Sequence, residues 1–158
     1  MSETQARPNR IPWPPIVYLA AIAVAIVAHF LLPLPWIGPP LSDILFAAGW
    51  LAIIAAVAME YAAMRALSRA RTTILPTKAS EHLVTSGPFS FTRNPIYLGN
   101  ALVMIGIGLI SGIAWFLILA VIAAFITQKL AIEREERHLQ GRFGKRYSDY
   151  AKRVRRWV

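Results

Sequence analysis

Long apolar runs separated by short polar segments are the main feature of this chain. Four runs of this kind cover residues 16–34, 44–64, 96–110 and 113–132. An α-helix rises about 1.5 Å per residue and the hydrocarbon core of a bilayer is about 30 Å thick, so runs of this length predict membrane-crossing helices. The third run has only 15 residues, which is short for a crossing. The pattern predicts four transmembrane helices, the last two joined as a tight hairpin at Ser111-Gly112.

Composition supports this interpretation and excludes a soluble domain. Hydrophobic residues make up 56% of the 158 residues and charged residues 16%, whereas soluble domains average about 45–50% and about 25%. The cysteine count is zero, which excludes disulfides and thiol catalysis. We expect one all-α membrane domain over residues 1–158. Two transmembrane helices lie in residues 1–71, and residues 72–158 form a core with the helical hairpin and an amphipathic cytoplasmic tail.

Basic residues gather in three clusters, and these predict an orientation. They lie at the N-terminus (Arg7 and Arg10), between residues 65 and 93, and in residues 129–158, which hold ten basic and four acidic side chains. The connections at residues 35–42 and 111–112 contain no Lys or Arg. Because cytoplasmic loops of membrane proteins are enriched in these residues, both termini and the central cluster are expected in the cytoplasm.

A polar segment precedes the third run and ends in Asn94-Pro95. This pair places a capping residue before a proline at the first helical position, so Asn94 is expected to cap the third helix. The positive N-terminal end of that helix suits an anionic group such as a carboxylate. The simpler interpretation is that Asn-Pro only starts the helix.

Two carboxylates, Glu135 and Glu136, follow the last run on a helical face that also holds apolar residues. Such carboxylates are costly at membrane depth unless they have partners. One interpretation pairs them with neighbouring arginines, namely Arg134, Arg137 and Arg142. In the other, a carboxylate binds a polar or cationic ligand that enters at the membrane interface.

Three other polar side chains have less specific surroundings. Glu60 near the end of the second run is expected either to pair with Arg65 or to snorkel toward the membrane surface, and His29 is expected to pack near the membrane surface. His82 in the polar loop is a candidate for acid–base chemistry, although a lone loop histidine usually has no such role. No HExxH or paired-histidine pattern predicts a metal, and no GxGxxG or P-loop motif predicts a soluble nucleotide-binding domain.

Several short motifs follow one another in the second half of the chain. Residues 83–89 read Leu-Val-Thr-Ser-Gly-Pro-Phe, and residues 93–99 read Arg-Asn-Pro-Ile-Tyr-Leu-Gly. After the apolar hairpin come Glu135-Glu136, Phe143-Gly144, Tyr147 and Tyr150. Residues 72–158 thus resemble the isoprenylcysteine carboxyl methyltransferase and phospholipid methyltransferase family. The signature of that family is Arg-His-Pro-x-Tyr-x-Gly, a hydrophobic stretch and then Glu-Glu.

This resemblance implies an integral membrane methyltransferase, with S-adenosylmethionine as methyl donor bound at the cytoplasmic face without a Rossmann domain. It implies a lipophilic acceptor that arrives laterally between helices, and it favours the inner membrane of a bacterium. No nucleic acid and no obligate protein partner are inferred. The cofactor-binding residues implied by the resemblance are His82, Leu83, Val84, Phe89, Asn94, Pro95, Ile96, Tyr97, Gly99 and Glu135. Glu136 and His82 are the candidate bases for an acceptor that must lose a proton, and the sequence does not choose between them.

Two positions depart from the family pattern. Asn94 stands where the eukaryotic signature has His, so no role of that imidazole is transferred to this chain. Ala131 stands where the prenylcysteine enzymes have an arginine facing the substrate. The acceptor is therefore left open among isoprenoid acids, lipid amines and small lipophilic molecules.

Two hypotheses of other classes are compatible with the same features. One is a non-catalytic membrane scaffold or transport component that keeps this fold. The other is a membrane reductase that uses NADPH. Binding of S-adenosylmethionine, of NADPH or of neither distinguishes the three.

Overall fold

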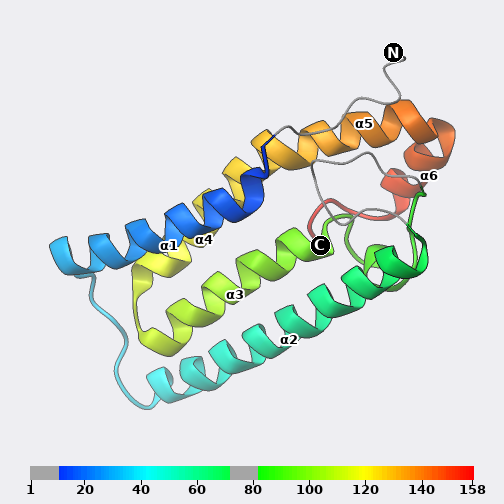
Figure 1. The fold of residues 1–158 in the computed structure, drawn as a ribbon. Coiled ribbons are helices and arrows are strands. Elements are labelled where there is room, and N and C mark those ends of the chain that lie inside the picture. Colours follow the sequence, from blue (N-terminus) through cyan, green and yellow to red (C-terminus); the bar gives the residue numbers. More distant parts are fainter. Residues whose placement is uncertain (1–10, 72–81) are drawn as a thin grey trace.

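The computed structural model describes residues 11–71 and 82–158, and within these ranges every regular element is a helix. The predicted all-α bundle is therefore confirmed (Figure 1). The N-terminal basic cluster of Arg7 and Arg10, and residues 72–81 of the polar loop, lie outside the described residues. The long helices are α1 (Trp13–Leu31), α2 (Leu41–Arg69), α3 (Pro95–Ser111) and α4 (Ala114–Thr127). The shorter ones are the 3₁₀ turn η2 (Gly87–Ser90), the π-helix η3 (Gln128–Ile132), α5 (Glu133–Phe143) and α6 (Lys145–Arg153).

The predicted spans correspond to these helices, with small differences at their ends. By length and composition, α1, α2 and the continuous helix Ala114–Phe143 are able to cross a membrane, whereas α3 is a shorter apolar helix of 17 residues. The first helix ends at Leu31 rather than at residue 34, because the residue before Pro33 is disfavoured in the helical region. The second helix extends to Arg69, beyond its apolar run.

The long helices pack in the order α2, α3, α4 and α1 (Figure 1). The helices α1 and α3 begin at the same end of the bundle, where α2 and α4 end. At the opposite end the indole nitrogen of Trp115 donates to the carbonyl oxygen of Leu32 at 2.8 Å. Gly112 turns the α3–α4 hairpin there with a φ of 70°, a left-handed conformation that glycine adopts without strain.

Close contact between α2 and α3 depends on glycine. A Cβ atom added to Gly49 would lie 2.8 Å from the carbonyl oxygen of Gly106, and one added to Gly106 would lie 2.6 Å from Cγ1 of Ile53. Small residues of this kind allow helix backbones to approach closely inside a membrane. A larger side chain at either glycine would therefore force the two helices to shift relative to each other.

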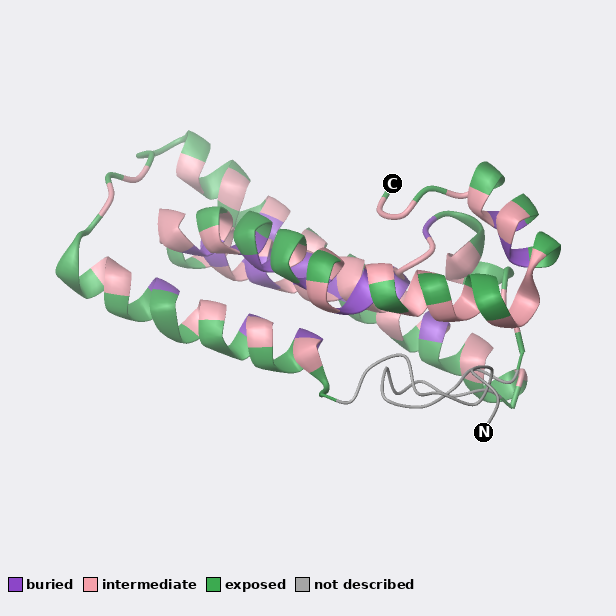
Figure 2. Cartoon of the chain, turned by 90° about the horizontal axis from the view of Figure 1, so that it is seen from above, coloured by how far each residue is buried: buried purple, intermediate pink, exposed green. Residues whose placement is uncertain are grey.

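Apolar side chains also cover the outside of the bundle. In Figure 2 the buried residues of α1 lie on the side that faces the other helices, and its outer side is exposed. Exposed apolar residues include Leu19, Leu51 and Val121, each more than 65% exposed. A continuous apolar outer surface of this extent requires lipid around it, so the chain is an integral membrane protein.

Candidate functional site

The polar end of the bundle is organised around the start of α3. Before this helix, η2 makes a tight turn in which the Ser90 hydroxyl donates to the carbonyl oxygen of Gly87 at 2.6 Å. Thr92, which is only 2% exposed, follows the turn and accepts a hydrogen bond from the backbone amide of Asn94 at 3.2 Å. Pro95 then occupies the first helical position, as predicted.

The C-terminal segment returns to the start of α3 and fixes it there. The backbone amide of Arg93 donates to the carbonyl oxygen of Arg155 at 3.0 Å. The carbonyl oxygen of Arg156 accepts two hydrogen bonds, from the Thr92 hydroxyl at 3.1 Å and from the Asn94 side-chain amide at 2.9 Å. The predicted cap is therefore wrong in one respect. Asn94 occupies the N-cap position without a side-chain capping bond, because its amide group is turned toward Arg156.

Tyr97 and Glu135 meet between the first turn of α3 and the first turn of α5. The Tyr97 hydroxyl donates to Oε1 of Glu135 at 2.6 Å, across 38 residues of sequence. Both side chains are half-buried. This contact brings together two residues for which the family resemblance implies cofactor binding.

Glu136 forms ion pairs with two arginines from distant segments. Arg156 donates through Nε and Nη2 to the two carboxylate oxygens at 2.9 and 2.6 Å. Arg93 Nη1 lies 3.2 Å from Oε1. Of the two interpretations, the one that paired Glu136 with neighbouring arginines of its own helix is wrong in its partners, because Arg93 and Arg156 from distant segments occupy both oxygens. The hydrogen bond to Glu136 also raises the pKa of the Arg156 guanidinium.

Two tyrosines of α6 support this ion-pair cluster. Tyr147 and Tyr150 are each 4% exposed and pack edge to face. Arg93 donates to the hydroxyl of Tyr147 at 3.3 Å, and the hydroxyl of Tyr150 donates to the carbonyl oxygen of Phe89 at 2.6 Å. Burial raises the pKa of both phenols, so they stay protonated. The cluster thereby links η2 and α6.

A π-helical turn immediately before α5 sets the direction of the two glutamates. The turn covers Gln128–Ile132 within an otherwise continuous helix that runs from α4 into α5. A π-turn adds one residue to the helical register, so the residues that follow are rotated relative to a regular helix. Trp157 donates to the side-chain oxygen of Gln128 in this turn at 2.8 Å.

The other predicted site residues differ in how far they are exposed. His82 is exposed, whereas Leu83, Val84, Phe89 and Ile96 are half-buried.

Gly99 is on the side of α3 that faces α2. A Cβ atom there would overlap the Glu60 carboxyl group, so the glycine makes room for this side chain. Of the two alternatives for Glu60, the pair with Arg65 does not form among the residues that the structure describes, where Oε1 of Glu60 has no hydrogen-bond partner.

Two contributors to the site were missed by sequence reasoning. Arg156 belongs to a run of basic residues at the C-terminus, and nothing local separates it from Arg153 or Arg155. Thr92 has no pattern around it that predicts burial. Both are recognised only from long-range contacts, since Thr92 bonds to Arg156 across 64 residues of sequence and Arg156 bonds to Glu136 across 20.

The comparisons with known proteins identify the family. The family described as phospholipid methyltransferase matches residues 44–146. This chain belongs to the phospholipid methyltransferase family. The matched range covers α2 to the start of α6, and thus contains Tyr97, Glu135 and Glu136 but neither α1 nor Arg156.

One relative of this family member has a name that refers to metal resistance. The nickel-cobalt-cadmium resistance protein NccN of Alcaligenes xylosoxydans xylosoxydans is 37% identical over 78 residues, which is 49% of this chain. The chain covers 36% of the length of NccN. No solved structure matches this phospholipid methyltransferase family member.

Proposed function

We propose that this protein transfers the methyl group of S-adenosylmethionine to a lipophilic acceptor. The observation that carries the proposal is the 2.6 Å hydrogen bond between Tyr97 and Glu135. It joins the Pro-x-Tyr and Glu-Glu parts of the family signature at the polar end of a membrane bundle. The family match over residues 44–146 supports a methyltransferase in general, and the donor and the acceptor are our inference.

The residues around this contact fit S-adenosylmethionine. The backbone amides of Ile96 and Tyr97 belong to the first turn of α3, where a helix offers its amides no carbonyl partner, so they suit the methionine carboxylate. The Glu135 carboxylate suits the ammonium group or a ribose hydroxyl of the donor. The aromatic rings of Phe89 and Tyr97 suit the positive sulfonium.

The residues of the chain contribute alignment, exclusion of water and handling of a proton. When bound, S-adenosylmethionine supplies a methyl carbon to which an acceptor lone pair bonds while the carbon–sulfur bond breaks and leaves a neutral thioether. Holding the two partners in line can lower the barrier by about 7–11 kcal/mol. Both oxygens of Glu136 bind guanidinium groups, so we assign this residue to positioning Arg93 and Arg156. The exposed His82 remains the candidate base for an acceptor that must lose a proton.

The site is proposed to face the cytoplasm of a bacterium, in its inner membrane. The basic side chains of α5, α6 and the C-terminus gather at the end of the bundle that holds Tyr97 and Glu135. Since positive loops stay on the cytoplasmic side, this end and both termini are assigned there. A water-soluble donor then enters from the cytoplasm.

Calorimetric titration of the purified protein in lipid nanodiscs tests the proposal. We expect saturable S-adenosylmethionine binding that Glu135→Ala and Tyr97→Ala weaken by about tenfold to a hundredfold, because each removes a hydrogen bond to a charged group. Glu133→Ala is the matched control, since Glu133 pairs with Lys129 on the surface of the same helix turn. Circular dichroism checks that each variant is folded.

Two results would overturn the proposal. A folded wild-type protein that binds neither S-adenosylmethionine nor NADPH would favour the scaffold or transport hypothesis. Binding of NADPH alone would favour the membrane reductase.

A further inference from the structure

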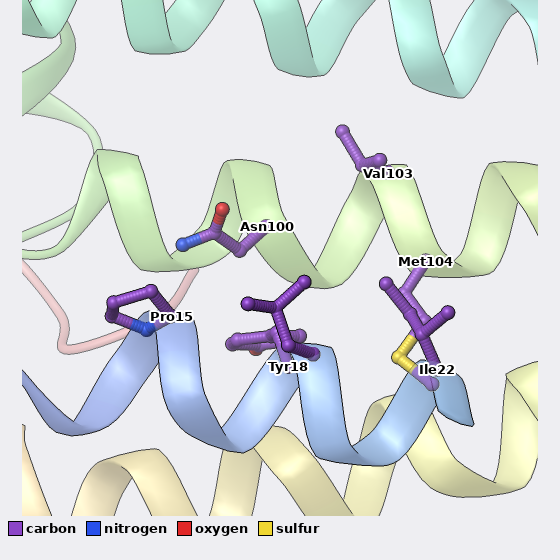
Figure 3. Close-up of a pocket in the computed structure, with 7 residues that line it drawn as sticks. Pro15, Tyr18, Ile22, Asn100, Val103 and Met104 are labelled. Atoms are coloured by element: carbon purple, nitrogen blue, oxygen red, sulfur yellow. The ribbon is translucent and has the colours of Figure 1, made fainter. Parts of the chain in front are cut away.

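A pocket of about 290 Å³ lies between α1 and α3 (Figure 3). It forms because α1 packs mainly on α4 and touches α3 at few points. Leu19 at its rim is 68% exposed, on the surface that faces lipid. The pocket is therefore open toward the membrane, and its volume is close to the lower limit of small-molecule sites, which is about 300 Å³.

The lining of the pocket changes from polar to apolar along its length. The helices α1 and α3 start at the same end of the bundle, so Tyr18 and Asn100 lie nearer that end than Ile22 and Met104 (Figure 3). Tyr18 is 6% exposed, and its hydroxyl has no hydrogen-bond partner among the described residues. A buried hydroxyl without a partner costs free energy, which a bound ligand would recover. Among the described residues, the pocket lining contains no acidic or basic side chain.

The polar end of the pocket is next to the proposed donor site. Tyr97, Asn100 and Met104 are spaced by three and four residues, so they share one face of α3. Asn100 is about 4.5 Å further along the helix axis than Tyr97. A ligand whose head reaches Asn100 therefore has its head close to the Tyr97–Glu135 contact.

We propose that this pocket binds the methyl acceptor, a single-chain or ring-sized lipophilic molecule with an uncharged, hydrogen-bonding head such as a phenol or hydroxyl group. The inference rests on the proposed function. The head lies at Tyr18 and Asn100 and the hydrocarbon part at Ile22 and Met104. A two-chain phospholipid exceeds the pocket. Because α1 lies outside the matched residues 44–146, acceptor selectivity is assigned to a helix beyond the part that defines the family.

Photo-crosslinking in nanodiscs tests this assignment without requiring catalysis. The probe is dodecylphenol with a diazirine on its chain, in dioleoyl phosphatidylcholine nanodiscs, and mass spectrometry maps the adducts. We expect adducts concentrated on the pocket-facing residues of α1 and α3.

Tyr18→Phe removes one hydrogen bond and is expected to lower the yield of adducts about threefold to tenfold. Ile22→Trp fills the pocket and is expected to lower it further. Tyr61→Phe on the exposed face of α2 is the matched control and should leave the yield unchanged.

The outcomes separate this inference from the proposed function. Adducts spread evenly over α2 and the other lipid-facing helices, or equal yields in Tyr18→Phe and wild type, would overturn the acceptor pocket. Stronger competition by unlabelled dioleoyl phosphatidylethanolamine than by unlabelled dodecylphenol would overturn the single-chain assignment. The proposed function fails instead if S-adenosylmethionine does not bind, whatever the crosslinks show. We expect Tyr18→Phe to keep the donor affinity of the wild type.

Discussion

Glu136 joins three segments that are far apart in the sequence. It belongs to α5 and binds both Arg93, which precedes α3, and Arg156 near the C-terminus. Removing one member of such a partly buried cluster leaves another charge without its partner, which costs more than the loss of one contact between neutral groups. At the residue scale, this carboxylate therefore fixes the position of the C-terminal segment against α3.

Replacing Arg156 with alanine tests this role. Arg156→Ala removes two hydrogen bonds to Glu136, and we expect the free energy of unfolding to fall by about 1–3 kcal/mol. The value should be in the lower half of this range, since the Arg156 side chain is 30% exposed. Arg155→Ala is the control, because the contact of Arg155 with Arg93 uses its backbone carbonyl. Thermal unfolding in detergent provides the measurement, and equal melting temperatures for the two variants would contradict the prediction.

A second prediction at this scale concerns the pH dependence of stability. Burial lowers the pKa of His138 below its usual 6.5, and the charge of Arg142 lowers it further. The unfolded chain then takes up this proton at a higher pH than the folded chain does. The contribution of His138 to the free energy of unfolding is therefore complete above about pH 6.5. It is lost as the pH falls from there through the folded-state pKa of His138.

The variant His138→Gln isolates this contribution. As the pH falls from about 7 to about 5, we expect the unfolding free energy of the wild type to decrease by more than that of His138→Gln. Denaturant unfolding at a series of pH values measures it. A difference that is constant over this range would show that His138 titrates alike in the folded and unfolded chains.

At the scale of elements, replacing glycine with alanine is expected to have opposite effects at the α2–α3 interface and on the exposed helix α5. Gly49→Ala gains helix propensity, but its methyl group would lie 2.8 Å from the Gly106 carbonyl oxygen, so α2 must move. We expect a net loss of about 1–3 kcal/mol. Gly141→Ala on α5 meets no atom within 4 Å and should gain up to about 1 kcal/mol. Thermal unfolding of the pair measures this contrast, and a stabilised Gly49→Ala would show that the interface is looser than described.

The helices could be predicted from the sequence because each depends on a local pattern. Apolar runs identified α1 to α4, and Asn94-Pro95 identified the start of α3 within one residue. The direction of the Asn94 side chain could not be predicted, because its partner is 62 residues away. The π-turn at Gln128–Ile132 could not be predicted either, because no local sequence pattern distinguishes these residues from the α-helical residues around them. Long-range contacts thus decide the details of the site, while local patterns decide the helices.

The whole molecule separates two environments along its length. At one end, the C-terminal segment, η2 and α6 form a polar layer around the start of α3. At the other, Gly112 and the loop after α1 close the bundle with few charges. The proposed function needs this difference between the two ends, because a water-soluble donor and a lipophilic acceptor must reach one site by different routes. The proposed function therefore predicts that the start of α1 and the end of α6 lie on the same side of the membrane.

The absence of cysteine from the sequence makes this topology directly testable. Single cysteines at Gly38 and Ser111 mark the end with few charges, and those at Ser90 and Lys152 mark the polar end; all four positions are exposed. With the positive end in the cytoplasm, a membrane-impermeant maleimide should label Gly38→Cys and Ser111→Cys in intact bacterial cells with a permeabilised outer membrane. It should label Ser90→Cys and Lys152→Cys only after the inner membrane is opened.

Labelling of Gly38→Cys and Ser111→Cys from different sides of the membrane would contradict the four-helix crossing, because α3 would then not span the membrane. A reversed pattern would keep the four crossings but place the donor site outside the cytoplasm, where S-adenosylmethionine made in the cytoplasm would not reach it.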